Sequence, residues 1–419
     1  MSDKHYVILN PGYDYASYMV KFLNEYQYKA VAVFTNEQQY DVYKNNYESE
    51  LESCIDAKFL MTDYADLEAL AQAILSESWI NEDLQGIIPW EEFTIEIGAE
   101  LGEHLGLNWN PVSVIHRFRN KYALKSYLRE NSDIRVNQSA IVNTVEEVQE
   151  FIEAVGKWPI VVKPTEGAGS RGVFFAESLE EILEQCEHVF STGQGEILLE
   201  EYIGGNEFVV NGITNAQGDV LITDVWIYDK RESHGVKNLY YQTIKVDRSE
   251  PYFEPLAYYA GSIIETLGLK KSPFHMELKY DDDGPCIIEC GARFAGGNQP
   301  VFASLLHEHS LFELAACHYM EDIPFDIGDV HYDKYDQHQA RIIKGIQSYE
   351  IPSISGVYGI EEVQQLPSFY QIGFIKPVGS YLPVTVDLFS ASYEIYLFHE
   401  DPEQIEEDAN RLRELLYYE

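Results

Sequence analysis

A glycine-rich segment between two strand-like runs constrains the fold more than any other part of this chain. Residues 167–172 read Gly-Ala-Gly-Ser-Arg-Gly, which matches the glycine spacing of dinucleotide-binding loops. Those loops join a strand to a helix, whereas here Ile160–Lys163 precedes the glycines and the strand-like Val173–Ala176 follows them. The segment is therefore a hairpin that either covers phosphate groups with backbone N–H donors or is an ordinary flexible turn. A protein kinase is excluded, because its lysine follows the loop whereas Lys163 precedes it.

Charge and composition narrow the class of protein. The 419 residues include 29 Lys+Arg and 70 Asp+Glu, so the formal charge is −41. This charge excludes sequence-independent binding of duplex nucleic acid as a main role and disfavours anionic membranes, so neither is an expected partner. No apolar run reaches the roughly 18 residues that a membrane helix requires, and the first residues lack a signal-peptide pattern. A reduced, cytoplasmic protein without structural zinc is expected, because the cysteines are few, scattered and outside any Cys-x-x-Cys motif. They are Cys54, Cys186, Cys286, Cys290 and Cys317.

The first 115 residues alternate short apolar runs with longer amphipathic ones. This rhythm predicts a doubly wound parallel sheet whose ligand crevice lies near Asn10–Gly12 and residues 90–92. Glu91 and Glu92 are there either as acids at a helix N-terminus or as substrate-binding groups. The predicted strands are Tyr6–Leu9, Ala30–Phe34, Lys58–Met61 and Gly86–Pro89, and the predicted helices are Tyr15–Tyr26, Asp66–Leu75 and Phe93–Leu105.

The remainder is predicted to begin with a helix from Pro111 to about Glu130 and then to become rich in strands. The tail after about residue 330 is mixed and ends in an acidic helix, Pro402–Leu416. Expected strands are Glu196–Glu200, Phe208–Ile213, Val220–Tyr228, His275–Tyr280, Cys286–Cys290, Phe369–Ile375 and Val384–Leu388, with a helix at Leu179–Val189.

Two glutamates flank the strong turn signal Asp-Asp-Asp-Gly-Pro at residues 281–285. A two-residue turn at 283–284 would put Glu277 and Glu289 on opposite faces of the hairpin. A three-residue loop with Gly284 left-handed would place them opposite each other on one face. Carboxylates facing each other repel, so such a pair is either exposed, shares a proton or holds a hard divalent cation such as Mg²⁺. Arg293 and the Gly296-Gly297 pair nearby favour the cation.

In this order the motifs resemble those of the ATP-grasp carboxylate–amine ligases, in particular the bacterial L-amino-acid (dipeptide) ligases of the bacilysin-synthetase type. The resemblance covers residues 1–320 and, more loosely, the tail. It implies an α/β chain with an ATP-grasp fold, an N-terminal Rossmann-like domain at 1–115, an ATP-grasp domain at 116–325 and a C-terminal mixed α/β lobe at 326–419. Residues 159–207 would form a mobile subdomain that covers the nucleotide.

The resemblance also implies a role for each motif residue. Lys121 and Lys163 resemble the pair that grips the ATP phosphates, and the 167–172 loop resembles the phosphate-covering lid. Glu277 and Glu289 resemble the ligands of one or two Mg²⁺ ions, with Mn²⁺ as an alternative, although Gly291 replaces the family's usual asparagine. Arg293 resembles the arginine at the acyl phosphate, with the Gly296 backbone beside it. The remaining ATP-binding residues are Gly169, Ser170, Arg171, Gly172, Glu200, Glu201, Ile203 and Glu207.

The implied reaction is ATP-dependent amide formation through an acyl phosphate, with ADP and phosphate as products. The alternatives are a carboxylase that acts through carboxyphosphate and a nucleotide-binding module without turnover. The locally basic segment 228–237 suggests that Arg231 and His234 bind substrate, while a solvated turn explains the segment equally well. Glu91 and Gly297 are further candidates for substrate binding. Small molecules are the expected partners and a homodimer is the default assembly. The sequence names neither the acid nor the amine.

Overall fold

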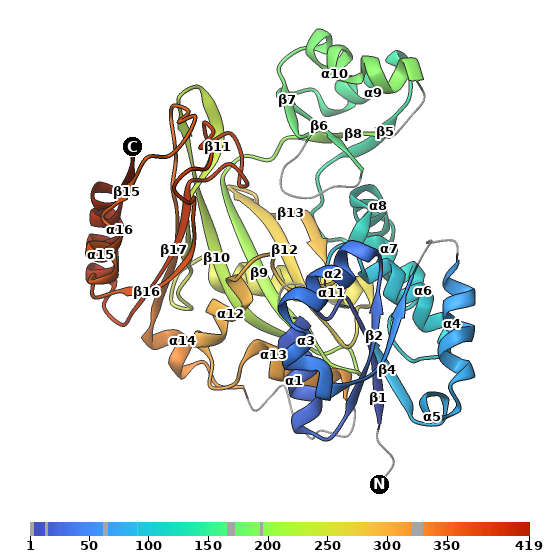
Figure 1. Cartoon of the computed structure of the whole chain (residues 1–419). Coiled ribbons are helices and arrows are strands. Elements are labelled where there is room, and N and C mark those ends of the chain that lie inside the picture. The colour runs from blue at the N-terminus through green and yellow to red at the C-terminus, as the bar shows by residue number, and fades with distance from the viewer. Residues whose placement is uncertain are drawn as a thin grey trace.

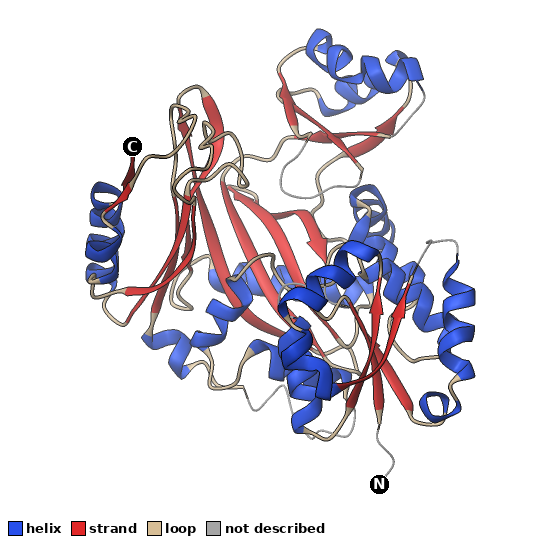
Figure 2. Cartoon of the chain, viewed as in Figure 1, coloured by secondary structure: helices blue, strands red, loops and turns tan. Residues whose placement is uncertain are grey.

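The computed structural model describes residues 4–12, 16–61, 66–89, 91–165, 172–192, 196–320 and 330–419 (Figure 1). Three parts can be distinguished by colour: a blue N-terminal part, a small teal and green part above it, and a large sheet that runs into the red C-terminal part. The small part carries its helices on one side of its sheet (Figure 2).

An all-parallel sheet organises the N-terminal part. Its strands are β1 His5–Leu9, β2 Lys29–Phe34, β3 Ile55–Leu60 and β4 Leu84–Ile88. They lie in the order β3-β2-β1-β4, which confirms the predicted doubly wound sheet. Strand β2 is buried along nearly its whole length, as expected for a strand with helices on both faces. The helices are α1 Ala16–Glu25, α2 Glu37–Asn46, α3 Glu48–Leu51, η1 Glu52–Cys54, α4 Leu67–Ser76, α5 Ser78–Asn81 and α6 Ile95–Leu105.

The helix predicted from Pro111 to about Glu130 is in fact two helices, α7 Val112–Arg119 and α8 Lys121–Asn131. The break falls at Asn120, whose backbone is extended and whose side chain accepts hydrogen bonds from two N–H groups of the first turn of α8. An asparagine N-cap of this kind starts a new helix. The break places Lys121 at the first position of α8.

The small upper part is an antiparallel sheet with strand order β5-β8-β6-β7. Helix α9 begins with a capping box between Thr144 and Glu147 and ends at Gly156, which has a left-handed backbone. The elements are β5 Ser139–Val142, α9 Val145–Val155, β6 Ile160–Pro164, β7 Phe174–Ala176, α10 Leu179–Thr192 and β8 Ile197–Glu201.

The largest sheet has eight strands and is antiparallel throughout. Its strands are β9 Asn206–Thr214, β10 Val220–Ser233, β11 Val236–Lys245, β12 Ser272–Asp281, β13 Gly284–Gly291, β14 Gln339–Lys344, β16 Phe369–Ile375 and β17 Tyr393–His399. The order β13-β12-β9-β10-β11-β14-β17-β16 joins the C-terminal strands to the central ones, so one sheet runs across the predicted boundary at 325/326.

The predicted strand Val384–Leu388 is wrong, because these residues are irregular. The Ser390 hydroxyl accepts hydrogen bonds from the N–H groups of Val386 and Asp387, so a local side-chain turn replaces strand pairing. The predicted helix at the end of the chain is confirmed as α16 Pro402–Leu415. Other elements are α11 Phe253–Leu267, α12 Gln299–Ala303, η3 Ser304–Leu306, α13 Leu311–Tyr319, α14 Asp333–Gln337, β15 Val357–Tyr358, α15 Ile360–Gln364 and β18 Tyr417–Tyr418.

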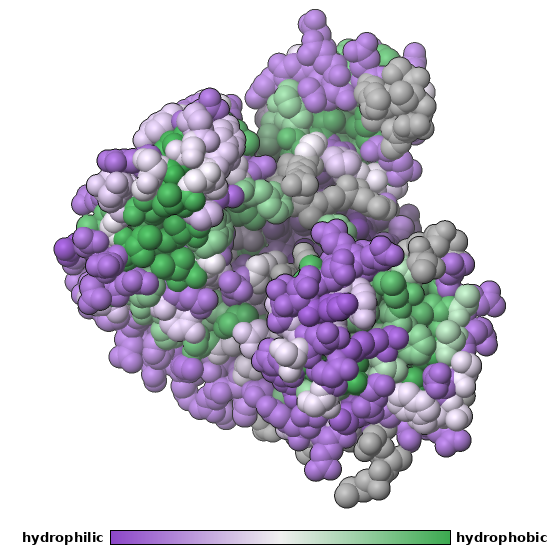
Figure 3. Space-filling model, viewed as in Figure 1, coloured by the Kyte–Doolittle hydropathy of each residue, from purple (hydrophilic) through white to green (hydrophobic). Residues whose placement is uncertain are grey.

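The surface in Figure 3 is largely hydrophilic, with apolar patches over the C-terminal and N-terminal parts. Across the described residues, none of the helices has the length and apolar character needed to cross a bilayer. The same view shows a hollow where the three parts meet.

Candidate active site

The hairpin of β12 and β13 places two carboxylates opposite each other, since Glu277 pairs with Glu289 in the ladder. Neither predicted turn is present, because the turn consists of Asp282-Asp283 and pairs residue 281 with residue 284. A register shift next to Glu277 leaves Ile288 as an extra residue on β13 and restores the opposition of the two glutamates. The shared face is confirmed, and the route to it is corrected.

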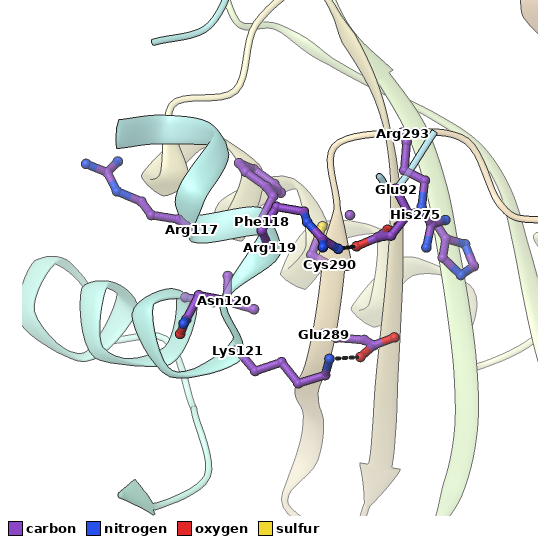
Figure 4. Close-up of a pocket in the computed structure, with 12 residues that line it drawn as sticks. Glu92, Arg117, Phe118, Arg119, Asn120, Lys121, His275, Glu289, Cys290 and Arg293 are labelled. Carbon is purple, nitrogen blue, oxygen red and sulfur yellow. Dashed lines mark hydrogen bonds and ion pairs between the residues drawn. The ribbon is translucent and has the colours of Figure 1, made fainter. Parts of the chain in front are cut away.

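Neighbouring basic side chains offset the repulsion between these carboxylates. The Nζ atom of Lys121 lies 2.9 Å from an oxygen of Glu289 (Figure 4), and Nε2 of His275 lies 3.6 Å from an oxygen of Glu277. Burial alone would raise the pKa of Glu277, but His275, Lys230 and Arg293 lower it to about 2. Glu277 therefore stays ionised at neutral pH, beside its partner on the ladder.

The donor set suits a hard divalent cation whose coordination is completed by substrate. Mg²⁺ commonly takes one or two carboxylates together with phosphate oxygens and water. In the parts of the chain that the structure describes, no three His, Cys, Asp or Glu side chains gather to form a complete metal site. Gly291 contributes no side chain, so two glutamates are what the hairpin offers.

A buried polar row supports His275 from behind. Its Nδ1 lies 2.8 Å from the side-chain oxygen of Asn211, and the Asn211 amide donates to Asp224 at 2.5 Å. All three side chains are buried, and they come from the adjacent strands β12, β9 and β10. The row holds the imidazole with Nε2 toward Glu277. Sequence reasoning missed it, because only the strand register brings these residues together.

The predicted nucleotide residues Lys163 and Glu200 form an ion pair of 2.9 Å. A second lysine that sequence reasoning missed, Lys125, lies 2.6 Å from the other oxygen of Glu200. Asn137 donates a hydrogen bond of 3.3 Å to the same carboxylate and also bonds the backbone carbonyl of Glu201. Lys125 follows Lys121 by four residues on α8, which is the one signal that pointed to it.

Glu207 is held by two lysines, Lys230 and, at 3.1 Å, Lys279. Lys230 also lies over the ring of Tyr240 at 4.1 Å from its centroid and borders the same cavity as Glu277. Sequence reasoning noticed the basic segment around it but selected its neighbour, Arg231. Successive side chains of a strand point to opposite faces, so choosing the wrong one of two adjacent basic residues changes the face.

Arg231 lies away from this cavity. Its guanidinium binds Asp229 at 2.7 Å and stacks on Tyr241 at 3.7 Å from the ring centroid, while Arg413 covers the same ring at 3.9 Å. His234 sits in the turn between β10 and β11 and lies 2.7 Å, through Nε2, from the Thr385 carbonyl. The structure thus joins His234 to a C-terminal loop and does not bring either residue to the glutamate pair.

Arg293 extends from the segment after β13 and binds Glu92 through its Nε at 2.5 Å. Arg119, from the end of α7, binds the other oxygen of Glu92 (Figure 4). Burial alone would raise the pKa of Glu92, but the two guanidinium groups hold it below its ordinary value. Glu92 therefore connects the N-terminal part to the arginine beside the glutamate pair.

The neighbouring Glu91 is buried and accepts a hydrogen bond of 2.7 Å from Asn10 at the end of β1. This contact places Glu91 at the predicted crevice of the parallel sheet. Gly296 and Gly297 are exposed in the turn before α12, and Gly297 has a left-handed backbone. Gly172 closes the glycine loop with a φ of 72°, whereas Gly169, Ser170 and Arg171 lie outside the described residues.

A cavity of about 260 Å³ lies between the small upper part and the large sheet. The β10–β11 hairpin and the C-terminal loop 386–388 also border it. The basic segment of the hairpin was expected at the substrate pocket, whereas the C-terminal loop was not. The predicted residues along its wall are Lys121, Lys163, Glu200, Glu201, Ile203, Glu207, Glu277 and Glu289. Arg293 and Glu92 line an adjoining pocket that shares Lys121 and Glu289 with this cavity.

Comparison with known proteins agrees with this architecture. Residues 156–300 match the ATP-grasp domain family. Dapdiamide A synthase from Enterobacter agglomerans is 29% identical over 239 residues, which is 54% of either chain. An L-arginine-specific L-amino acid ligase from Bacillus subtilis is 24% identical over 58% of this chain and 59% of its own length. The chain thus matches little more than half the length of these curated relatives.

A solved structure extends the likeness to the whole fold. The L-amino acid ligase from Bacillus licheniformis superposes with a TM-score of 0.75 at 17% identity, covering 100% of this chain and 99% of that one. The resemblance predicted from the motifs is confirmed: residues 156–300 match the ATP-grasp domain family, and the whole chain shares the fold of that solved L-amino acid ligase.

Proposed function

We propose that this chain is an ATP-dependent carboxylate–amine ligase that joins an amino acid or a related acid to an amine. The observation that carries the proposal is the opposition of Glu277 and Glu289 on the wall of a cavity that also contains Lys121, Lys163 and Lys230. The cavity wall carries five lysines and six carboxylates, and this mixture, with two of the carboxylates facing each other, fits a triphosphate with its divalent ion better than a simple anion or a simple cation.

The net charge of the molecule explains why the lysines of the cavity matter for binding ATP. A chain with a formal charge of −41 repels ATP as a whole, so binding requires a local concentration of positive charge. We assign phosphate binding to Lys121 and Lys163. Lys230 faces Glu207 and Glu277, and we assign it to the phosphate that is transferred. Glu207 would accept from the ribose, and the backbone of 201–203 would border the adenine.

Glu277 and Glu289 would hold Mg²⁺, for which Mn²⁺ would substitute. When bound, the ion supplies positive charge that screens the phosphate oxygens. The protein's own contribution is positional: it holds the acid in line with the γ-phosphate and keeps water out when the upper part closes.

In the first step, a carboxylate oxygen of the acid attacks the γ-phosphorus, and the bond from that phosphorus to the ADP oxygen breaks. In the second step, the amine nitrogen attacks the acyl carbon, inorganic phosphate leaves with its electron pair, and the amine proton passes to phosphate or solvent. Arg293 would hold the oxygens that carry negative charge in both steps, because its guanidinium offers several donors at fixed angles.

The names of the relatives support amino acids as the substrate class. One is named for a dapdiamide and two are named as L-amino acid ligases. We therefore favour the ligase over the carboxylase.

The test is a screen of amino-acid pairs with Mg-ATP, following phosphate release and product mass. We expect phosphate release that requires both an acid and an amine, with a product whose mass equals the sum of the two minus one water. Omission of each component in turn is the control. Phosphate release that depends on bicarbonate would instead establish a carboxylase, and ATP binding without turnover on any pair would contradict the proposal.

A further inference from the structure

Lys125 is a fully buried lysine to which the proposed chemistry assigns no task. Its side chain is 0% exposed, and its Nζ lies 2.6 Å from one oxygen of Glu200, whose own side chain is 2% exposed. Lys163, which is 5% exposed, binds the other oxygen of Glu200 at 2.9 Å. A single buried carboxylate therefore lies between two lysines, and the three side chains carry a net charge of one positive unit.

Removing such charges from water is unfavourable unless each has a partner. Burial lowers the pKa of Lys125 to about 8, although Glu200 acts in the opposite direction. Burial would also raise the pKa of Glu200, but Lys125 and Lys163 lower it to about 2. Glu200 thus remains an anion that requires at least one lysine beside it at all times.

The two lysines reach Glu200 from different parts of the fold. Lys163 and Glu200 belong to neighbouring strands β6 and β8 of the small upper part, whereas Lys125 belongs to α8 below it. On α8, Lys125 lies one turn after Lys121, which points to Glu289 at the carboxylate hairpin. Helix α8 therefore supplies one lysine to the metal-binding end of the cavity and one to the nucleotide-covering part.

We propose that Lys125 is a positioning residue: it is the permanent counter-ion of Glu200, and it allows Lys163 to leave that carboxylate for the nucleotide phosphates. The inference rests on the proposed function, since it assumes that Lys163 meets ATP in this cavity. Lys125 itself does not line the cavity, whereas Lys163 and Glu200 both do. One lysine is placed to stay, and the other is placed to move.

The alternative arrangement explains why two lysines are needed. With Lys163 alone, each binding event would strip Glu200 of its only cation and leave a buried charge unpaired, which is strongly unfavourable. With Lys125 present, Glu200 keeps a partner at 2.6 Å while Lys163 turns, and the Asn137 amide supports the same carboxylate. The cluster thus lowers the cost of bringing Lys163 to the phosphates.

The test compares ATP with adenosine as titrants for Lys125→Met. In the variant, Glu200 retains Lys163 as its sole cation, so we expect the dissociation constant for ATP to rise by about tenfold or more. Adenosine lacks phosphates, so its affinity should change by less than about twofold. Equal losses for both ligands, or unchanged ATP affinity, would overturn the inference.

The double variant Lys125→Met/Glu200→Gln separates positioning from a general structural role. Without the buried carboxylate, Lys163 is no longer held, so adding Lys125→Met to Glu200→Gln should change the dissociation constant for ATP by less than about threefold, whatever Glu200→Gln costs by itself. A tenfold loss in the Glu200→Gln background as well would contradict the inference. Both proteins in this comparison lack the buried carboxylate, so the comparison stands even where Lys125→Met alone is unstable.

Lys157→Met is the matched control. Lys157 binds Glu201, the neighbour of Glu200 on β8, at 2.7 Å, but on the surface, where its side chain is 53% exposed. ATP affinity in this variant should match that of the unmodified protein; a tenfold loss would show that any lysine next to β8 has the same effect. If the unmodified protein fails to bind ATP, the proposed function itself is wrong. If the unmodified protein binds ATP and Lys125→Met binds it equally well, only the role of Lys125 is refuted.

Discussion

Glu200 and Glu92 each lie between two basic side chains, yet these two clusters differ in chemistry. Glu200 lies between Lys125 and Lys163, all nearly or fully buried, and Glu92 lies between Arg119 and Arg293, which are 11% and 14% exposed. Lysine is a point charge on a flexible stem, whereas arginine is a planar fork with fixed donor angles. The lysine cluster therefore suits exchange of partners, and the arginine cluster suits holding one geometry.

Both clusters also join separate parts of the fold. The lysine cluster ties α8 to the small upper part, and the arginine cluster ties the N-terminal part to the segment after the carboxylate hairpin. The hairpin with Glu277 and Glu289 lies between them. We infer a nucleotide end that has to move and an acyl end that has to stay fixed.

The largest effect should come from replacing Arg293 by lysine, which keeps the charge and removes the fork. The remaining ammonium group cannot bind Glu92 and the reacting oxygens at the same angles, so we expect kcat to fall by about 100-fold. The dissociation constant for ATP should change by less than about twofold. Titration of ATP and the rate of phosphate release provide the two measurements, and a fall in ATP affinity with normal kcat would reverse our assignment of the two ends.

A pair of neighbouring residues gives the next largest effect. Lys230→Met removes a cation from the cavity and should raise the KM for ATP by about tenfold, because one charge-assisted contact is lost. Arg231→Met, one residue further along β10, removes a guanidinium that stacks on Tyr241 outside the cavity. We expect the KM for ATP and for both substrates to stay within about twofold in this variant. Equal effects of the two substitutions would show that the face assignment is wrong.

A smaller effect is expected for Glu92→Gln, which keeps the shape of the side chain and removes its charge. Arg293 would lose its ion pair, and its guanidinium would no longer be held in one orientation. We therefore expect kcat/KM for the acid to fall by about fivefold to tenfold while ATP affinity stays constant. Glu96→Gln is the control, since Glu96 lies 3.5 Å from Arg119, the other arginine that binds Glu92. A comparable loss in the control would assign the effect to Arg119 instead.

The smallest effect concerns stability against pH. The pKa of Glu200 lies at about 2 in the folded chain against an ordinary value of 4.5. Because the folded-state pKa is depressed, its stabilising contribution is complete above about pH 4.5 and is lost as the pH falls toward 2. Urea unfolding at pH 5 and pH 3 should therefore show an extra loss on the order of 1–3 kcal/mol that Glu200→Gln lacks. Parallel losses in both proteins would contradict the buried ionised cluster.

Local patterns in the sequence predicted much of the fold and part of the site. Strand and helix positions followed from short apolar runs, and Lys163, Glu200 and the glutamate pair followed from motifs whose parts lie close together along the chain. The predicted turn of the carboxylate hairpin was wrong, because the register includes a bulge at Ile288. Such a bulge depends on how β13 pairs with β12 and cannot be recognised in a run of apolar residues.

Contacts between residues far apart in the sequence could not be predicted either, because only the packed fold brings such residues together. Lys125 meets Glu200 across 75 positions, and Arg293 meets Glu92 across 201. A lone lysine on an amphipathic helix or an acid at a helix start is usually a solvated residue, and only the packed fold shows that these are buried or paired. The split of the helix at Asn120 likewise required the observed cap.

The most direct measurement of the central claim is electron paramagnetic resonance of Mn²⁺ in the presence of a non-hydrolysable ATP analogue. If Glu277 and Glu289 hold the ion that accompanies the triphosphate, the unmodified protein should bind Mn²⁺ tightly only together with the nucleotide. The double variant Glu277→Gln/Glu289→Gln should lose this binding while retaining its folded structure by circular dichroism. Unchanged Mn²⁺ binding in the double variant would contradict the account.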